Sequence, residues 1–141
     1  MDKKTENLNS LLKGELSAVE SYEIALKNAK TDHVIAAFND CMQCHAKRAN
    51  ALSGLITQMG GEPATKSGAW GAFAKTVEAG SAILGEGPSI GSLQEGEDHG
   101  IELYKAEMKN LEGPEYAIVR NELYPAQERT QKRLADLKVK V

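Results

Sequence analysis

Between positions 35 and 59, side chains recur at alternating steps of three and four residues, the spacing that places them on one stripe of a single long helix. One of the eight positions in this stripe is polar, and it is a histidine. The stripe consists of Ile35, Phe38, Met42, His45, Ala49, Leu52, Ile56 and Met59. It predicts a helix of roughly 28 residues, about 42 Å long, that ends at Gly60-Gly61. Such a helix must be covered by partners of similar length, so the pattern favours a helical bundle.

Three further segments carry the same periodicity. The first begins after Thr5, a candidate N-cap; the third opens at Pro88-Ser89; and the last runs from Gly113-Pro114 to about Leu137, with a kink expected at Pro125. Two of these stripes each include an inward-facing glutamate and a tyrosine. These four residues are Glu15, Tyr22, Glu97 and Tyr104. The short link at residues 30–33 makes the first two helices antiparallel neighbours.

An internal repeat relates the two halves of the chain. An offset of 82 residues takes Glu15 to Glu97 and Tyr22 to Tyr104, and it continues from Leu52 to Leu134. Two helical hairpins of one pattern, joined by the long segment 62–88, predict a single domain over residues 1–141. The fold class expected is all-α: a ferritin-like up-down-down-up four-helix bundle, with a long crossover carrying a short extra helix, residues 69–84, between helices two and three.

Composition restricts the partners and the compartment. The formal net charge is −3 and there is no Lys/Arg cluster, so the chain offers no basic surface to bind nucleic acid. No apolar stretch approaches the roughly 18 residues of a membrane span, and the polar N-terminus lacks a signal region. We therefore expect a cytoplasmic protein with neither nucleic-acid nor membrane partners. Homo-oligomerisation remains open, and no reaction or protein partner can be inferred.

Several short motifs are spread over nearly the whole chain: Leu8–Leu12, Tyr22 with Ala25, Met59–Pro63, Glu95–His99 followed by Tyr104-Lys105, and Gln127–Gln131. In these motifs the chain resembles a small bacterial family of ferritin-like four-helix-bundle proteins of unknown function. The resemblance implies the bundle fold and a bacterial, soluble setting, and it implies no established reaction.

Di-iron members of the ferritin-like superfamily take one glutamate from each of two helices and a Glu-x-x-His pair from each of the other two. Carried over to this chain, the pattern predicts a central metal site, for iron or another divalent metal, that departs from the full ligand set. Met42 stands where the second helix should carry a carboxylate, so one ion is more plausible than two. The predicted ligands are Glu15, His45, Glu97, Glu128 and Gln131. The register of the last helix stays open, because the ungapped repeat places Gln127 opposite His45.

Two other readings compete with the metal site. Cys41, Cys44 and His45 spell the Cys-x-x-Cys-His pattern of covalent haem attachment, but the chain has few aromatic residues to line a haem, and haem is not favoured. Alternatively, the bundle is a non-catalytic structural or oligomerising protein. Its central polar residues would then satisfy one another, with Lys47 and Arg48 near enough to His45 to provide an ion pair.

Overall fold

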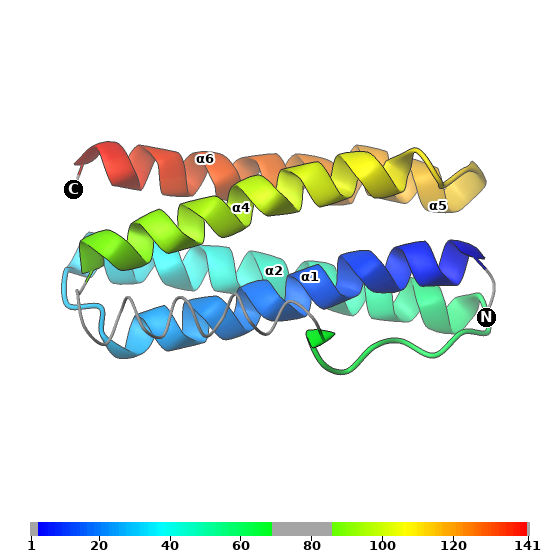
Figure 1. Ribbon diagram of the computed structural model, residues 1–141, viewed down its shortest axis with the longest axis horizontal. Helices are drawn as coiled ribbons and strands as arrows, with labels where there is room; N and C mark the ends of the chain where they lie inside the picture. The colour runs from blue at the N-terminus through cyan, green and yellow to red at the C-terminus, as the bar shows by residue number, and fades with distance from the viewer. Residues whose placement is uncertain (1–2, 69–85, 141) are drawn as a thin grey trace.

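The computed structural model describes residues 3–68 and 86–140, and every regular element within these ranges is helical. The elements are α1 (Lys3–Lys27), α2 (Asp32–Gln58), α4 (Glu86–Met108), α5 (Gly113–Ile118), the π-helix η2 (Val119–Leu123) and α6 (Tyr124–Lys140). The last three follow one another without a break and form one long rod (Figure 1). For these residues the prediction of an all-helical chain is confirmed. The short helix expected at 69–84 lies outside the described residues.

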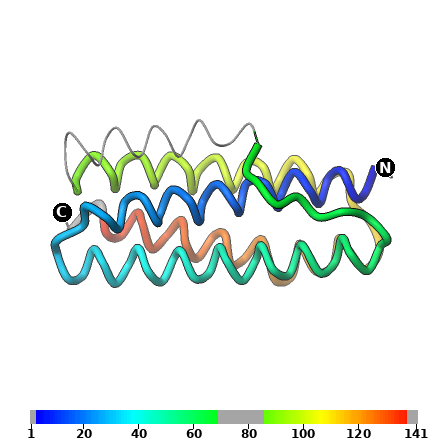
Figure 2. Tube along the Cα trace, turned by 90° about the horizontal axis from the view of Figure 1, so that it is seen from below, coloured from blue at the N-terminus to red at the C-terminus, as the bar shows by residue number. Residues whose placement is uncertain are grey.

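The four long rods lie side by side, two in each direction. In Figure 1, α1 and α6 run from right to left, whereas α2 and α4 run from left to right. Helix α1 packs against α2 and α4, and α6 packs against α4 and α2. Figure 2 shows residues 59–68 turning back from the end of α2 along α1. There Asn9 Nδ2 donates to the carbonyl of Glu62 at 3.0 Å, and Asn9 Oδ1 accepts from the amide of Ala64 at 2.8 Å.

The apolar core falls into two clusters, one toward each end of the bundle. The first includes Tyr22, Phe38, Cys41 and Leu134, and the second includes Leu8, Leu12, Leu52, Ile56 and Tyr104. The middle between them is polar: Glu15, His45 and Glu97 are each no more than 3% exposed. Burial of the apolar clusters supplies the main driving force for folding, and it encloses the ionisable groups at the centre.

The turn before α2 is bonded to a carboxylate from another helix. Thr31 occupies the N-cap position of α2, but its hydroxyl does not bond its own helix. It donates instead to Glu86 Oε2 at 2.7 Å, and Glu86 Oε1 accepts the amides of Thr31 and Lys30. The carboxylate therefore joins the α1–α2 turn to the first turn of α4.

Of two predicted helix ends, one is confirmed and the other is wrong. Gly60 adopts φ 81°, the left-handed conformation expected where α2 stops. Thr5 was wrong as an N-cap, because it lies inside α1 and is 2% exposed. Its side chain packs against Gly61, where an added Cβ would lie 2.3 Å from Thr5 Cγ2.

The buried face of α2 differs from the predicted stripe in its first half. Val34, Ala37 and Cys41 are fully buried there, while Ile35 and Met42 are half-buried. From His45 to Ile56 the predicted stripe holds. In this second half one buried residue lies outside the stripe: Arg48, which is 3% exposed.

The last rod accommodates Pro125 through a π-helix. Proline has no backbone N–H, so it cannot complete the preceding helical turn. The chain loosens just before it into the wider spacing of η2, where the amide of Tyr124 bonds the carbonyl of Val119. The predicted kink takes the form of this local π-bulge, and helical geometry resumes in α6.

Candidate functional site: a buried ionic centre

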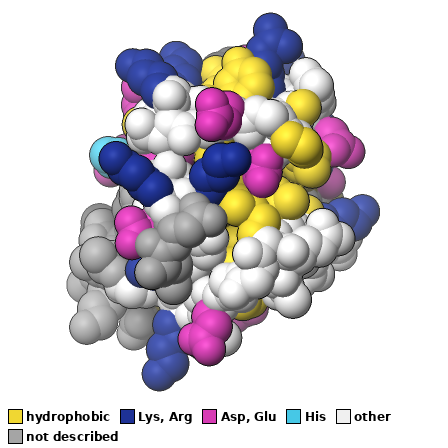
Figure 3. All heavy atoms as spheres, turned by 90° about the vertical axis from the view of Figure 1, so that its right-hand side faces the viewer, with side chains coloured by type: hydrophobic (Ala, Val, Ile, Leu, Met, Phe, Trp, Pro, Cys, Tyr) yellow, Lys and Arg dark blue, Asp and Glu magenta, His cyan; other side chains and the backbone are white. Residues whose placement is uncertain are grey.

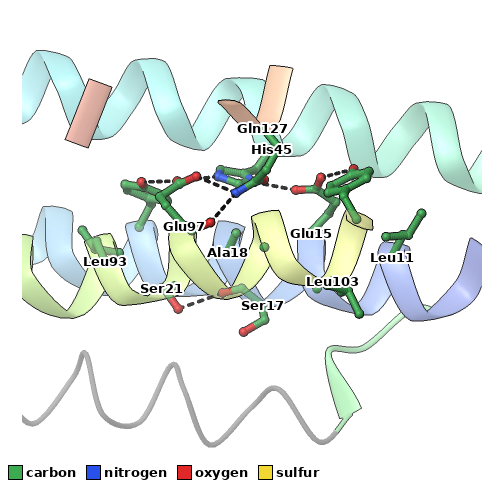
Figure 4. A pocket seen from close by; sticks show the side chains of 15 residues that line it. Leu11, Glu15, Ser17, Ala18, Ser21, His45, Leu93, Glu97, Leu103 and Gln127 are labelled. Atoms are coloured by element: carbon green, nitrogen blue, oxygen red, sulfur yellow. Dashed lines mark hydrogen bonds and ion pairs between the residues drawn. The ribbon is translucent and has the colours of Figure 1, made fainter. Parts of the chain in front are cut away.

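His45 bridges two carboxylates at the middle of the bundle. Its Nδ1 atom lies 2.5 Å from Glu15 Oε1, and its Nε2 atom lies 2.8 Å from Glu97 Oε2. Figure 4 shows the imidazole between the two carboxylates, which come from α1 and α4. The three residues that the stripes predicted to point inward are therefore brought together.

Each carboxylate also accepts a bond from a tyrosine of the other half of the repeat. Tyr104 donates to Glu15 Oε2 at 2.5 Å, and Tyr22 donates to Glu97 Oε2 at 2.6 Å. The Tyr22 ring also stacks on His45, with ring centroids 5.6 Å apart. The result is a continuous chain of five side chains, Tyr22, Glu97, His45, Glu15 and Tyr104, with approximate two-fold symmetry about the imidazole.

Arg48 brings a second cation into the centre. Its Nε atom lies 3.2 Å from Glu15 Oε2, an ion-pair distance at which the N–H does not point at the oxygen. Its Nη1 atom donates to Gln127 Oε1 at 3.0 Å, and its Nη2 atom donates to Thr130 Oγ1 at 3.2 Å. The guanidinium thus connects α2 to α6 as well as to α1.

Gln127 and Thr130 complete the shell around Glu97. Gln127 Nε2 donates to Glu97 Oε1 at 2.9 Å and also to the Glu97 carbonyl, while Thr130 Oγ1 donates to Glu97 Oε1 at 2.7 Å. Both oxygens of this carboxylate therefore carry two hydrogen-bond partners. A buried carboxylate so well satisfied has little drive to take up a proton.

The charges of the centre balance. Burial disfavours ionised Glu15, but the charges of Arg48 and His45 outweigh burial and leave the pKa of Glu15 below its ordinary 4.5. Burial likewise opposes ionisation of Glu97, and the charge and hydrogen bond of His45 lower its pKa. Burial disfavours protonated His45, but the charges of Glu97 and Glu15 raise its pKa above 6.5. Below the raised pKa of His45, two anions, Glu15 and Glu97, therefore face two cations, His45 and Arg48.

A further nitrogen of Arg48 lies close to the imidazole. Arg48 Nη2 lies 2.6 Å from His45 Nδ1. In the imidazolium form the Nδ1 proton points at Glu15, so Nδ1 cannot accept a bond from the guanidinium and the contact is between two donors. The two cations are held next to each other by the carboxylate that both of them face.

The 82-residue repeat extends to all of these positions. It takes His45 to Gln127 and Arg48 to Thr130, so each hairpin places a pair at i and i+3 toward the centre. The ungapped repeat was therefore the signal that could have located Gln127 and Thr130. Arg48 was anticipated as an ion-pair partner, but it does not lie on the predicted apolar stripe.

Two predicted ligands lie away from the centre. Glu128 is exposed and lines a surface groove with Tyr116 and Tyr124. Gln131 is half-buried and donates to Asp98 Oδ1 at 2.8 Å. Their neighbours Gln127 and Thr130 occupy the inward positions because the helix after Pro125 keeps the register of the ungapped repeat.

A small cavity lies beside the centre, between α1 and α4. Its volume is about 40 Å³, room for about two or three water molecules. Gly96 and Gly100 line it on α4, with Gly14 opposite on α1. Gly100 is constrained by packing, because a Cβ there would lie 2.4 Å from Gln127 Nε2. The glycine is thus what allows the Gln127 amide to reach Glu97.

The residues at the centre do not fit a metal ion as they are arranged. The imidazole lies between the two carboxylates, so the three side chains do not converge on one point, and Arg48 supplies a cation at Glu15. Among the described residues, no group of three His, Cys, Asp or Glu side chains could hold a metal.

The arrangement of Cys41, Cys44 and His45 does not fit covalent haem attachment either. Both nitrogens of His45 face carboxylates, and Cys41 is fully buried in the apolar cluster around Tyr22 and Phe38. Cys44 is half-buried. The two thiols and the imidazole therefore do not frame one exposed haem position.

Fold and centre together define an all-helical protein built around a buried network of ionised side chains. The chain belongs to the family described as a domain of unknown function (DUF2383), whose model matches residues 3–110. This match covers α1, α2 and α4, and it ends before Gln127 and Thr130. Comparison with the curated proteins and with the solved structures returned no match. No helix in the described part of the chain is long and apolar enough to cross a membrane.

Proposed function

We propose that this chain is a ferritin-like four-helix bundle in which the chain's own cations take the place of central metal ions, so that it acts as a metal-independent, non-catalytic bundle protein. In ferritin-like di-metal proteins, two helices each give a glutamate and the other two each give a Glu-x-x-His pair. Here Glu15 and Glu97 occupy the lone glutamate positions. The pairs are His45-x-x-Arg48 on α2 and Gln127-x-x-Thr130 on α6.

The observation that carries the proposal is the charge of these pairs. A di-metal centre uses anionic ligands to balance metal charge. In this chain the α2 pair supplies two positive charges and the α6 pair supplies none. The two glutamates are then neutralised from within the protein, and a divalent cation would add charge that no further anion balances. The directions of the four rods, with α1 and α6 opposed to α2 and α4, support the ferritin-like arrangement.

The test is metal content together with metal-dependent stability. We expect the purified chain, incubated with Fe(II), Mn(II) or Zn(II) and then desalted, to retain substoichiometric metal. We also expect the same melting temperature with added metal and with EDTA. Stoichiometric metal that is lost in Glu15→Ala/Glu97→Ala would overturn the proposal. A matched pair on the exposed faces of the same helices, Glu23→Ala/Glu102→Ala, controls for general loss of charge.

A second experiment tests whether the residues of the α2 and α6 pairs alone determine whether the bundle binds metal. The quadruple variant His45→Glu, Arg48→His, Gln127→Glu and Thr130→His restores a Glu-x-x-His pair on each of the two helices. We expect this variant to bind Co(II), with visible absorption bands that the parent chain does not produce. Equal Co(II) binding by the parent chain would contradict the proposal, and that measurement holds even if the variant does not fold.

A further inference from the structure

A surface groove follows the π-bulge on the last helical rod, away from the ionic centre. It has a volume of about 550 Å³, within the roughly 300–1,000 Å³ typical of ligand sites. Its apolar lining comes from Met108, Tyr116, Tyr124 and Pro125. We call it the Tyr116–Tyr124 groove. Figure 3 views this end of the bundle and shows a band of hydrophobic side chains edged by charged ones.

The groove is a preformed aromatic surface. Tyr116 and Tyr124 are half-buried, and Pro125 is exposed beside them. The Tyr124 ring is supported from below by Tyr104, with ring centroids 6.4 Å apart. Aromatic grooves of this kind accept the rings of proline residues in extended peptides, which lose little entropy on binding.

Two cations line the groove, Lys109 and Arg120. Several exposed cations of α6 are paired: Arg129 and Arg133 with Asp40, and Lys132 with Asp136. In contrast, within the described residues Lys109 has no carboxylate partner. In the same part of the chain, Arg120 has no carboxylate partner, and its Nη1 donates to Asn121 Oδ1 at 3.4 Å. Although the net charge of the chain is −3, two cations without a carboxylate partner among the described residues lie beside the two tyrosine rings of the groove.

We propose that the Tyr116–Tyr124 groove binds an extended acidic peptide segment that carries proline. Proline rings would lie on Tyr116, Tyr124 and Pro125, and carboxylates would pair with Lys109 and Arg120, the latter able to bind them through two parallel bonds. Glu128 also lines the groove, and its carboxylate can accept a hydrogen bond from a backbone N–H or a side-chain donor of the bound peptide.

The chain's own prolines do not provide this segment. Pro88 and Pro114 lie in the first turns of helices, and Pro125 is part of the groove. Pro63 is in an extended loop next to Glu62, but this loop is tied to α1 through Asn9. The occupant proposed is therefore a segment of another protein, and self-association becomes an outcome that the test must detect.

The test is binding of a fluorescein-labelled peptide, Gly-Asp-Pro-Tyr-Glu-Pro-Asp-Gly, measured by fluorescence anisotropy. A peptide with lysine at each acidic position is the charge control. We expect saturable binding of the acidic peptide that weakens as salt is raised. Amide NMR shifts should be confined to residues around Tyr116 and Tyr124.

Charge reversal of the groove supplies the decisive comparison. Lys109→Glu/Arg120→Glu should weaken binding by roughly tenfold or more, whereas Lys27→Glu/Lys47→Glu, exposed cations on other helices, should leave it unchanged. Circular dichroism confirms that each variant is folded. Equal binding of the lysine peptide, unchanged affinity in the groove variant, or dimerisation of the chain through the groove would overturn the proposal.

Discussion

Arg48 Nε lies 3.2 Å from Glu15 Oε2, with both side chains only 3% exposed. A buried ion pair recovers its desolvation cost only when its remaining polar atoms are also satisfied. Here Arg48 uses its other nitrogens on Gln127 and Thr130. The pair therefore specifies how α1, α2 and α6 sit together, in addition to balancing charge.

Removing this cation should be costly. Arg48→Met keeps much of the side-chain volume but removes the positive charge beside the buried Glu15 carboxylate. We expect a loss of about 3–5 kcal/mol of unfolding free energy. Urea denaturation monitored by circular dichroism measures it. The control Arg120→Met, at an exposed arginine, should change stability by no more than about 0.5 kcal/mol.

A compensating change should recover part of the loss. Glu15→Gln removes the charge that Arg48→Met leaves exposed to a low-dielectric surrounding, so the double variant should be more stable than Arg48→Met alone. A double-mutant cycle gives the coupling energy between the two residues. If Arg48→Met costs no more than Arg120→Met, the guanidinium is not what stabilises the centre.

Stability should depend on pH in two separate windows. The folded pKa values of Glu15 and Glu97 are lowered below 4.5, so their contribution is present above pH 4.5 and is lost as the pH falls through the folded values. The folded pKa of His45 is raised above 6.5, so its contribution is complete below pH 6.5 and is lost as the pH rises through the folded value. We expect maximal stability between pH 4.5 and 6.5.

Urea midpoints measured from pH 3 to 9 check this profile. His45→Gln should remove the decline on the alkaline side, and the exposed His33→Gln should preserve it. Nitrogen-15 NMR of the imidazole offers a direct reading, because both ring nitrogens of His45 should show predominantly the imidazolium shift at pH 6.5. A neutral ring at that pH would contradict the balance of two anions and two cations.

Gly100 tests how tightly α6 must approach α4. A Cβ at this position would lie 2.4 Å from Gln127 Nε2, so Gly100→Ala should displace the amide from Glu97 and cost about 1–3 kcal/mol. Gly91 is on the same helix, and a Cβ added there would have nothing within 4 Å. Gly91→Ala should instead stabilise the chain by up to about 1 kcal/mol. Thermal melts of the two variants should therefore shift in opposite directions.

Periodicity was sufficient to predict the all-helical fold and the inward positions of Glu15, His45 and Glu97, because burial on one face of a helix imposes a regular spacing on the residues of that face. It was not sufficient for Arg48. A long charged side chain beside an apolar stripe is usually solvated, and only the packed structure shows that its guanidinium reaches the centre.

The last helix illustrates a second limit. A search for metal ligands favours carboxylates, which led to Glu128 with Gln131, whereas the residues that face the centre are the neutral Gln127 and Thr130. Pro125 made the register uncertain, since a kink can rotate everything after it. The π-bulge absorbs the proline locally, and this adjustment depends on packing that the periodicity of one helix does not report.

The two cysteines should differ sharply in reactivity. Burial, together with the charge of Glu97, raises the pKa of the Cys41 thiol to about 12, and its side chain is 0% exposed. Because the thiolate is the reactive form, Cys41 should be inert toward Ellman's reagent in the folded protein at pH 8. Cys44 is half-buried and should react faster. We therefore expect Cys41→Ser to retain the native-state reaction and Cys44→Ser to lose it, with full labelling of Cys44→Ser only in urea. Rapid labelling of folded Cys44→Ser would mean that the cluster around Tyr22 and Phe38 opens far more readily than its packing indicates.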